Sequence, residues 1–247
     1  MIPNTGQKIV LLLIGLGAVL TLSPPSLQTW QYRDEAFYAV RMPSQISPIL
    51  PKSEADLDRD GSLECLQLTD RQVSILKAPC DESTLETPIA WQSPKEWQVI
   101  QAYLADFNRD SIPEVSLLVW RDFQPWFIDR YIPHPGRIDS FHDEQNQSCH
   151  VILIGWRRGA YGELWAGSAM ADPLRAFLPA DVDGNGREEL IALESRYTDP
   201  PGKPALALTA WEWNGFGFTL LARVNGSFRS MQPMIDPQGR VWIITQR

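Results

Sequence analysis

Short hydrophobic runs rich in Val, Ile and Leu alternate along this chain with clusters of Asp, Gly and Pro. Three of these runs directly follow an acidic stretch, and they span residues 63–68, 114–120 and 189–193. Short β-prone runs bounded by Asp, Gly and Pro are typical of strands. The pattern therefore predicts an all-β chain in which acidic loops lead into strands.

The three acidic stretches share one internal spacing. They span residues 56–64, 106–114 and 181–189, and we call them the first, second and third acidic loops. Oxygen-bearing side chains stand at positions 1, 3, 5 and 9, namely Asp56, Asp58, Asp60 and Glu64; Asp106, Asn108, Asp110 and Glu114; and Asp181, Asp183, Asn185 and Glu189. Closely spaced oxygen ligands on a tight loop suit a hard cation that takes about six to eight oxygens. The spacing predicts Ca²⁺, one ion in each loop, because crowded carboxylates repel one another without a cation between them.

An EF-hand is the obvious alternative, and the spacing argues against it. An EF-hand loop needs a bidentate Glu at position 12 and a helix on each side. Position 12 falls here on Gln67, Leu117 and Ala192, so the last acid comes at position 9 instead. A dockerin-type pair of loops would likewise need helices where this sequence predicts strands. The pattern indicates calcium loops that lie between strands.

An acidic loop of this spacing followed by a strand resembles the FG-GAP or VCBS repeat, the blade unit of integrin-α-like β-propellers. The resemblance covers residues 30–247 and implies a small β-propeller, or a propeller-like array, of about four blades. It also implies that the backbone carbonyls of Ser62, Ile112 and Arg187 complete the calcium ligands at position 7.

Two features depart from the family pattern. The Phe-Gly…Gly-Ala-Pro signature is not present in clean form, and Ser111 stands where Gly usually makes the sharp turn, which predicts weaker binding in the second loop.

The spacing between the loops also indicates the length of a repeated unit. A fourth stretch begins at Asp236 and repeats the loop-and-strand pattern, but its position 9 is Ile244, so we expect it to be free of metal. The spacing of the four starts suits a four-stranded blade with insertions. The last unit stops after the strand that follows its loop, and residues 32–40 are the natural candidate to complete it. An open arc completed by dimerisation or by a partner is the alternative.

The N-terminal segment predicts export. Residues 9–22 form an apolar run after Lys8, as in the hydrophobic region of a signal peptide, and short for a spanning helix. We expect residues 1–23 to be a signal peptide or a membrane anchor, 24–29 a linker, and 30–247 the propeller domain. A buried N-terminal strand or helix is the alternative. Export suits the loops, because extracellular calcium modules bind weakly and need abundant calcium.

Composition narrows the possible classes of protein further. The net charge of −8 offers no basic face for nucleic acid, and the hydrophobic content of 44% suits a folded core. Three cysteines are too few for a disulfide scaffold. An oxidising compartment would permit a bond between Cys65 and Cys80, and free thiols are the alternative.

Residues 121–150 are expected to form a long surface excursion that holds all three histidines, His134, His142 and His150, together with Asp122, Asp129, Asp139, Asp143 and Glu144. This excursion could be a second metal site or an acid/base cluster, and a solvated polar loop is the alternative. The spacing of the histidines fits no zinc pattern, and no nucleophile elbow, P-loop or dinucleotide motif occurs in the chain. We therefore expect a binding module for a surface protein or a glycan rather than an enzyme. A carbohydrate-active lyase or hydrolase that uses this excursion, and a structural subunit of an envelope complex, are the alternatives.

Overall fold

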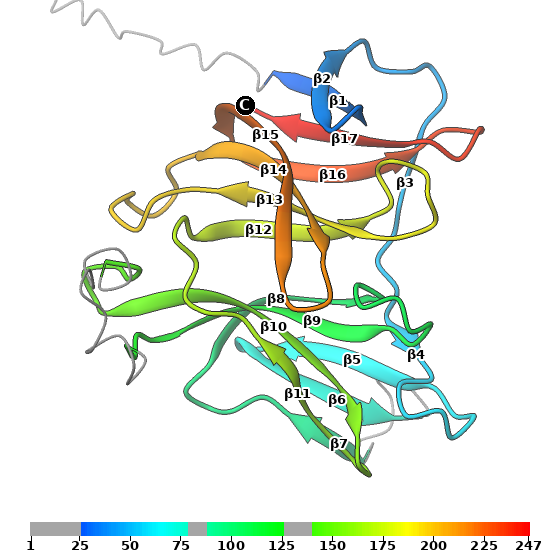
Figure 1. Cartoon of the computed structure of the whole chain (residues 1–247), viewed down its shortest axis with the longest axis vertical. Coiled ribbons are helices and arrows are strands. Elements are labelled where there is room, and N and C mark those ends of the chain that lie inside the picture. Colours follow the sequence, from blue (N-terminus) through cyan, green and yellow to red (C-terminus); the bar gives the residue numbers. More distant parts are fainter. Residues whose placement is uncertain (1–25, 79–87, 126–139) are drawn as a thin grey trace, which may run out of the picture.

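The computed structural model describes residues 26–78, 88–125 and 140–247, and every regular element in this part of the chain is a β-strand. The strands form four antiparallel sheets that follow one another as the blades of a four-bladed β-propeller arrangement (Figure 1). The expected all-β fold of about four blades is confirmed.

The first three blades follow one another along the chain, and each has its strands in one sequence-local set. Blade 1 consists of β4 (Glu54–Ala55), β5 (Glu64–Thr69), β6 (Gln72–Lys77) and β7 (Ile89–Gln92). Blade 2 consists of β8 (Gln98–Ala105), β9 (Glu114–Asp122), β10 (Gln147–Arg157) and β11 (Ala160–Ala166). Blade 3 consists of β12 (Leu174–Ala180), β13 (Glu189–Glu194), β14 (Ala205–Trp213) and β15 (Phe218–Phe228). The strands predicted after the three acidic loops are β5, β9 and β13.

Blade 4 combines strands from distant parts of the sequence. It consists of β16 (Ser230–Ile235), β17 (Val241–Gln246), β1 (Leu27–Arg33) and β2 (Ala36–Val40), with β3 (Ser47–Pro48) paired to the free edge of β16. Strand β1 pairs antiparallel with β17, so that Trp30 lies opposite Ile243 (Figure 1). An N-terminal segment thus completes the last blade as expected, but residues 27–30 pair with β17, ahead of the predicted residues 32–40, which form the end of β1 and the outer strand β2. Pairing begins at Leu27, so part of the expected linker already belongs to the blade.

Three hydrophobic cores lie between consecutive blades in the described parts of the chain. Apolar burial of this kind is the main favourable contribution to folding. It holds the blades together and so fixes the ends of the strands from which the acidic loops project. The core between blades 1 and 2 contains Val73, Val115 and Leu117; the core between blades 2 and 3 contains Phe107, Leu118 and Phe177; and the core between blades 3 and 4 contains Trp30, Leu208 and Phe228.

Residues 121–150 differ from the surface excursion that was expected. Strand β9 continues to Asp122 and β10 begins at Gln147, and the two strands pair along their length. Of the connection between them, the structure describes residues 123–125 and 140–146, and Asp129, His134 and Asp139 lie outside the described residues. The N-terminal residues 1–25 also lie outside the described residues. In the parts of the chain that the structure describes, no helix is long and apolar enough to span a membrane.

Candidate metal centres

Each acidic loop connects the first strand of a blade to the second. The first loop joins β4 to β5, the second joins β8 to β9, and the third joins β12 to β13. Neighbouring loops contact one another: Arg59 of the first donates to the backbone oxygen of Asp110 at 3.1 Å, and the Asp106 N–H donates to Glu188 of the third at 3.1 Å. The three loops therefore form a row at one end of the blades.

The Glu at position 9 is the first residue of the strand that follows each loop, and it is buried. Glu64, Glu114 and Glu189 are 0%, 2% and 1% exposed. Each accepts the backbone N–H of position 2, from Leu57 at 2.8 Å, Phe107 at 3.2 Å and Val182 at 3.0 Å. Position 2 is itself a buried apolar residue, so the strand end and the loop start are fixed together.

The side chains at positions 1, 3 and 5 hold the turn of each loop. Position 1 accepts the N–H of position 6, in the pairs Asp56–Gly61, Asp106–Ser111 and Asp181–Gly186. Position 3 accepts the N–H of position 5, in the pairs Asp58–Asp60, Asn108–Asp110 and Asp183–Asn185. Position 5 accepts the N–H of position 7, in the pairs Asp60–Ser62, Asp110–Ile112 and Asn185–Arg187. The same hydrogen bonds recur three times, so the shared spacing encodes one shared loop conformation.

Positions 4 and 6 adopt positive φ in all three loops. At position 6 the angles are 88° for Gly61, 69° for Ser111 and 82° for Gly186. Glycine adopts this region without a steric penalty, whereas a residue with a Cβ is strained there. The second loop therefore has a strained residue at its sharp turn, at the position where the sequence departs from the family pattern.

Acidic side chains converge in each loop. Ligand atoms within 4.8 Å of one another form three groups: Asp56, Asp58 and Glu64; Asp106, Asp110 and Glu114; and Asp181, Asp183 and Glu189. These groups could hold metal ions, and all nine residues were predicted ligands. Asp60 is the one predicted acid outside its group, and its carboxylate bonds the Ser62 N–H and pairs with Lys77. Asn108 and Asn185, and the carbonyls of Ser62, Ile112 and Arg187, stay predicted ligands.

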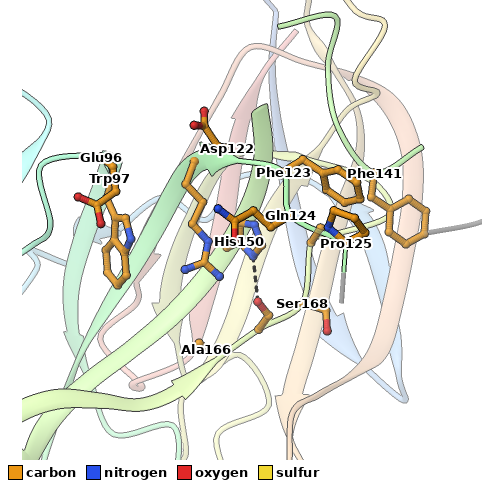
Figure 2. A pocket seen from close by; sticks show the side chains of 13 residues that line it. Glu96, Trp97, Asp122, Phe123, Gln124, Pro125, Phe141, His150, Ala166 and Ser168 are labelled. Carbon is orange, nitrogen blue, oxygen red and sulfur yellow. Dashed lines mark hydrogen bonds between the residues drawn. The ribbon is translucent and has the colours of Figure 1, made fainter. Parts of the chain in front are cut away.

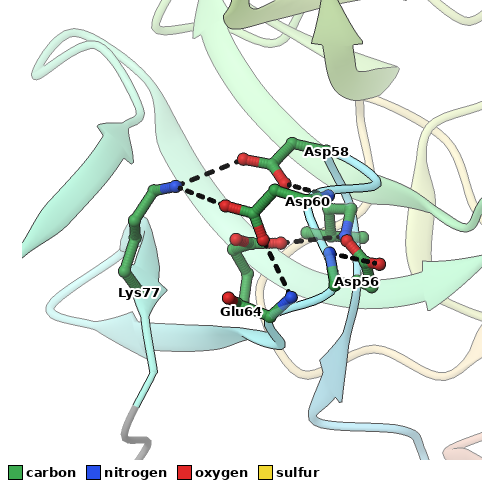
Figure 3. A network of polar contacts seen from close by, with 8 residues as sticks. Asp56, Asp58, Asp60, Glu64 and Lys77 are labelled. Carbon is green, nitrogen blue, oxygen red and sulfur yellow. Dashed lines mark hydrogen bonds and ion pairs between the residues drawn. The ribbon is translucent and has the colours of Figure 1, made fainter.

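The first loop combines unsatisfied oxygens with a neighbouring cation. Asp56 Oδ1 and Glu64 Oε1 are buried and have no hydrogen-bond partner in the described structure. Lys77 Nζ lies 3.2 Å from Asp58 Oδ2 and 3.4 Å from Asp60 Oδ2. Figure 3 shows Lys77 approaching these two carboxylates from the side opposite Asp56. The lysine neutralises part of the charge of the loop and leaves the two buried oxygens unpaired.

The carboxyl groups at position 9 have raised pKa values. Burial, followed by the charges of Asp110 and Asp106, raises the pKa of Glu114 to about 8. Burial, together with the charges of Asp183 and Asp181, raises the pKa of Glu189 to about 7. Burial also raises the pKa of Glu64. Proximity to a cation favours the ionised form of a carboxyl group, so a cation bound in these loops would lower the same pKa values.

The fourth loop, residues 236–240, is built differently. Asp236 has a buried carboxylate that accepts the backbone N–H of Gln238 and of Arg240. It also accepts Arg240 Nε at 2.7 Å and Trp242 Nε1 at 3.2 Å. Burial alone would raise its pKa, but these hydrogen bonds lower the pKa of Asp236 below its ordinary value. A guanidinium group thus supplies the positive charge in this loop, a role that the sequence interpretation missed.

The histidines described in residues 121–150 have structural contacts. His150 is buried between the hydroxyl of Ser148 at 2.7 Å and the carbonyl of Gly167 at 2.9 Å. Burial lowers the pKa of His150 to about 4, so the ring is neutral at pH 7. His142 packs against Phe123 with 4.9 Å between ring centroids. These contacts hold the two rings in place within the blade and its connecting turn.

The cysteines fall into two kinds. Cys65, on the strand that follows the first acidic loop, is disulfide-bonded. Its predicted partner, Cys80, lies outside the described residues. Cys149 is free and fully buried on β10, and burial raises the pKa of its thiol to about 12.

No protein-family model matches this chain, and no curated protein matches it. The resemblance to FG-GAP or VCBS repeats therefore stays a prediction that depends on the loop spacing and the strands that follow.

Proposed function

We propose that this protein is an exported calcium-binding β-propeller module of the FG-GAP or VCBS type, which binds a protein or a glycan at the cell surface. Up to three Ca²⁺ ions would occupy the three acidic loops. The four-bladed fold and the three convergent groups of acids support this proposal.

The observation on which the metal assignment depends is the environment of Glu64. Its side chain is fully buried, and Oε1 makes no hydrogen bond of normal geometry; the polar group that acts on this carboxyl from its surroundings is the Tyr161 hydroxyl, which is itself buried without a partner of normal geometry. A buried polar oxygen without a partner is unfavourable. Asp56 Oδ1 in the same group is also buried without a partner. A hard cation bound between these two carboxylates would satisfy both oxygens.

Calcium would act on the fold through the row of loops. Each loop joins two strands of one blade, and Arg59 and Glu188 connect neighbouring loops. A bound ion would cancel the repulsion among the carboxylates and hold each loop in one conformation. Because only the native state presents these groups together, binding would stabilise the folded protein by mass action.

One observation supports export. Cys65 is disulfide-bonded, and disulfides persist in oxidising compartments outside the cytosol. Calcium is plentiful in extracellular surroundings, where modules with weak sites are occupied. The apolar segment at residues 9–22 would then direct export or anchor the chain in the membrane.

The test is thermal unfolding of the purified protein in EDTA and in about 2 mM CaCl₂, with titration calorimetry for stoichiometry. We expect calcium to raise the melting temperature, with up to three ions bound per chain. Asp56→Asn combined with Glu64→Gln should remove one of these ions, and Glu144→Gln, at an exposed position, is the matched control. Equal melting curves in both buffers, with no heat of binding, would contradict the proposal.

A further inference from the structure

Two hollows adjoin on the surface of blades 2 and 3. The first, of about 640 Å³, lies at the start of β8 and the end of β9, which is the end of blade 2 opposite its acidic loop. The second, of about 330 Å³, lies between blades 2 and 3. Ala166, Gly167 and Ser168 line both hollows. The segment after β11 therefore forms a shared wall, and one extended ligand could contact both hollows.

The first hollow contains a cation that forms no ion pair with any of the described residues. Arg121 is half-buried, and its guanidinium lies over the ring of Trp97, 5.7 Å from the centroid. No hydrogen bond or ion pair from this guanidinium occurs within the described residues, and Glu163 acts on it only through its charge. Figure 2 shows Trp97 on one side of the hollow and Phe123 and Phe141 on the other. The donors of Arg121 are thus available to a ligand held between aromatic rings.

The charges around the hollow disfavour an anion. Glu96 and Asp122 are exposed and line it together with Arg121, and His150 in its wall is neutral at pH 7. The lining therefore offers both donors and acceptors without a net positive charge. A neutral ligand with many hydroxyl groups can use both, because each hydroxyl donates and accepts.

The second hollow is aromatic. It is lined by Trp165, Trp211, Phe216 and Phe218, and Phe216 is 88% exposed at the tip of the β14–β15 hairpin. The backbone N–H groups of Phe216 and Gly217 both donate to Asn214 Oδ1, at 2.9 Å each. The exposed ring is therefore presented on a fixed turn. An exposed aromatic ring beside a hollow is typical of a binding surface.

We propose that the two hollows form one cleft for a neutral oligosaccharide, in which the exposed ring of Phe216 stacks against one sugar unit and Arg121 with Asp122 binds the hydroxyl groups of another. A sugar ring has apolar C–H faces and hydroxyl edges, so it suits a cleft with aromatic rings at one end and mixed polar groups at the other. This inference rests on the binding role in the proposed function and names its ligand class. It does not depend on calcium.

The first experiment is a glycan array probed with the calcium-loaded protein, followed by titration calorimetry with the trisaccharide unit of the strongest neutral hit. Trigalacturonic acid is included as a charged sugar. We expect neutral oligosaccharides to bind and the acidic one to bind more weakly. An array on which no neutral glycan exceeds background, or on which acidic glycans bind best, overturns the proposal. Capture of proteins without any glycan binding overturns it as well.

Variants at the two ends of the cleft test its extent. Phe216→Ala and Arg121→Gln should each weaken binding of the trisaccharide about tenfold, equivalent to about 1.4 kcal/mol. Leu50→Ala is the matched control, since Leu50 is 78% exposed and lines neither hollow. Equal affinity of Phe216→Ala and the control overturns the proposal. Calcium titration of the same samples separates the two ideas: intact calcium binding without glycan binding removes only the cleft, and the reverse result removes only the metal sites.

Discussion

The third acidic loop and the fourth loop occupy equivalent places in neighbouring blades. Each joins the first strand to the second, and each begins with an Asp that accepts backbone N–H groups of its own turn. In the third loop Asp181, Asp183 and Glu189 converge. In the fourth loop the side chain of Arg240 contacts Asp236 directly.

The difference separates two roles of the leading Asp. Holding the turn requires only its hydrogen bonds to the backbone, and both loops have these. Binding a metal requires further acids that converge on one point, which only the third loop of this pair has. The fourth loop satisfies its buried carboxylate with a guanidinium, so its stability should not depend on calcium.

The largest expected effect that separates the acidic loops from the fourth loop is that of pH on the metal-free protein. The pKa values of Glu114 and Glu189 are raised to about 8 and about 7. The native state therefore holds protons that the unfolded state has released between about pH 4.5 and pH 8, and stability falls as pH rises through this window. Asp236, whose pKa is lowered, contributes no change there. We expect the melting temperature to fall by on the order of 10 °C from about pH 5 to about pH 8.

Melting curves after metal removal and buffer exchange, repeated in calcium, measure this effect. The fall should be much smaller with calcium, and Glu114→Gln combined with Glu189→Gln should flatten it. Buried His150 opposes this effect below about pH 6.5, because its lowered pKa makes stability rise with pH there. A metal-free melting temperature that rises between about pH 6.5 and pH 8 would therefore show that these carboxyl groups are not protonated in the folded protein.

The next effect concerns the fourth loop. Arg240→Gln leaves the carboxylate of Asp236 buried without its cation, and breaking such a pair is destabilising. We expect the melting temperature to fall by roughly 5 °C, equally in EDTA and in calcium. Arg41→Gln, at an exposed position, is the matched control. A fall seen only in EDTA would mean that calcium reaches the fourth loop too.

The third effect concerns the third loop alone. Glu189→Gln keeps an acceptor for the Val182 N–H but removes one converging charge. We expect the calcium-dependent stabilisation to decrease by about 1–2 kcal/mol, as for one weak site at millimolar calcium. Calorimetry should find one ion fewer, with Glu144→Gln unchanged. An unchanged stoichiometry would exclude Glu189 as a ligand.

The smallest effect concerns Lys77 in the first loop. This loop has converging acids, as the third loop has, and also a basic side chain that pairs with its acids, as the fourth loop has. The Lys77 side chain is 43% exposed and pairs with Asp58 and Asp60. Exposed ion pairs are weak, so Lys77→Ala should raise the calcium affinity of the first loop only about two- to fivefold. Titration in a background of Glu114→Gln and Glu189→Gln isolates this loop. A lower affinity in the variant would show that Lys77 supports the site rather than competing with the ion.

The sequence predicted the elements whose signals are local. Each acidic loop is followed by the expected strand, and the N-terminal strand completes blade 4. Lys77 could also have been placed, because β5 and β6 form a hairpin around Asp70 and Arg71 in which Glu64 lies opposite Lys77. Pairing residues outward from this turn in the sequence would have placed Lys77 opposite Glu64.

Contacts between blades could not be predicted in this way. Glu188 caps the Asp106 N–H, and Arg59 donates to Asp110, only because packing brings neighbouring loops together. The cleft has the same origin, since Arg121 and Phe216 belong to different blades. Such contacts depend on how the sheets pack, and no spacing along the chain encodes that.

The pairing of β1 with β17 has a consequence for biosynthesis. Strand β1 is translated before the other three blades, and its partner β17 is translated only after them. At about 5–20 residues per second, β1 waits for roughly 10–40 s with an unpaired edge. Such an edge invites aggregation. We therefore expect the nascent chain to depend on a holding chaperone, and translation speed to affect the yield of soluble protein.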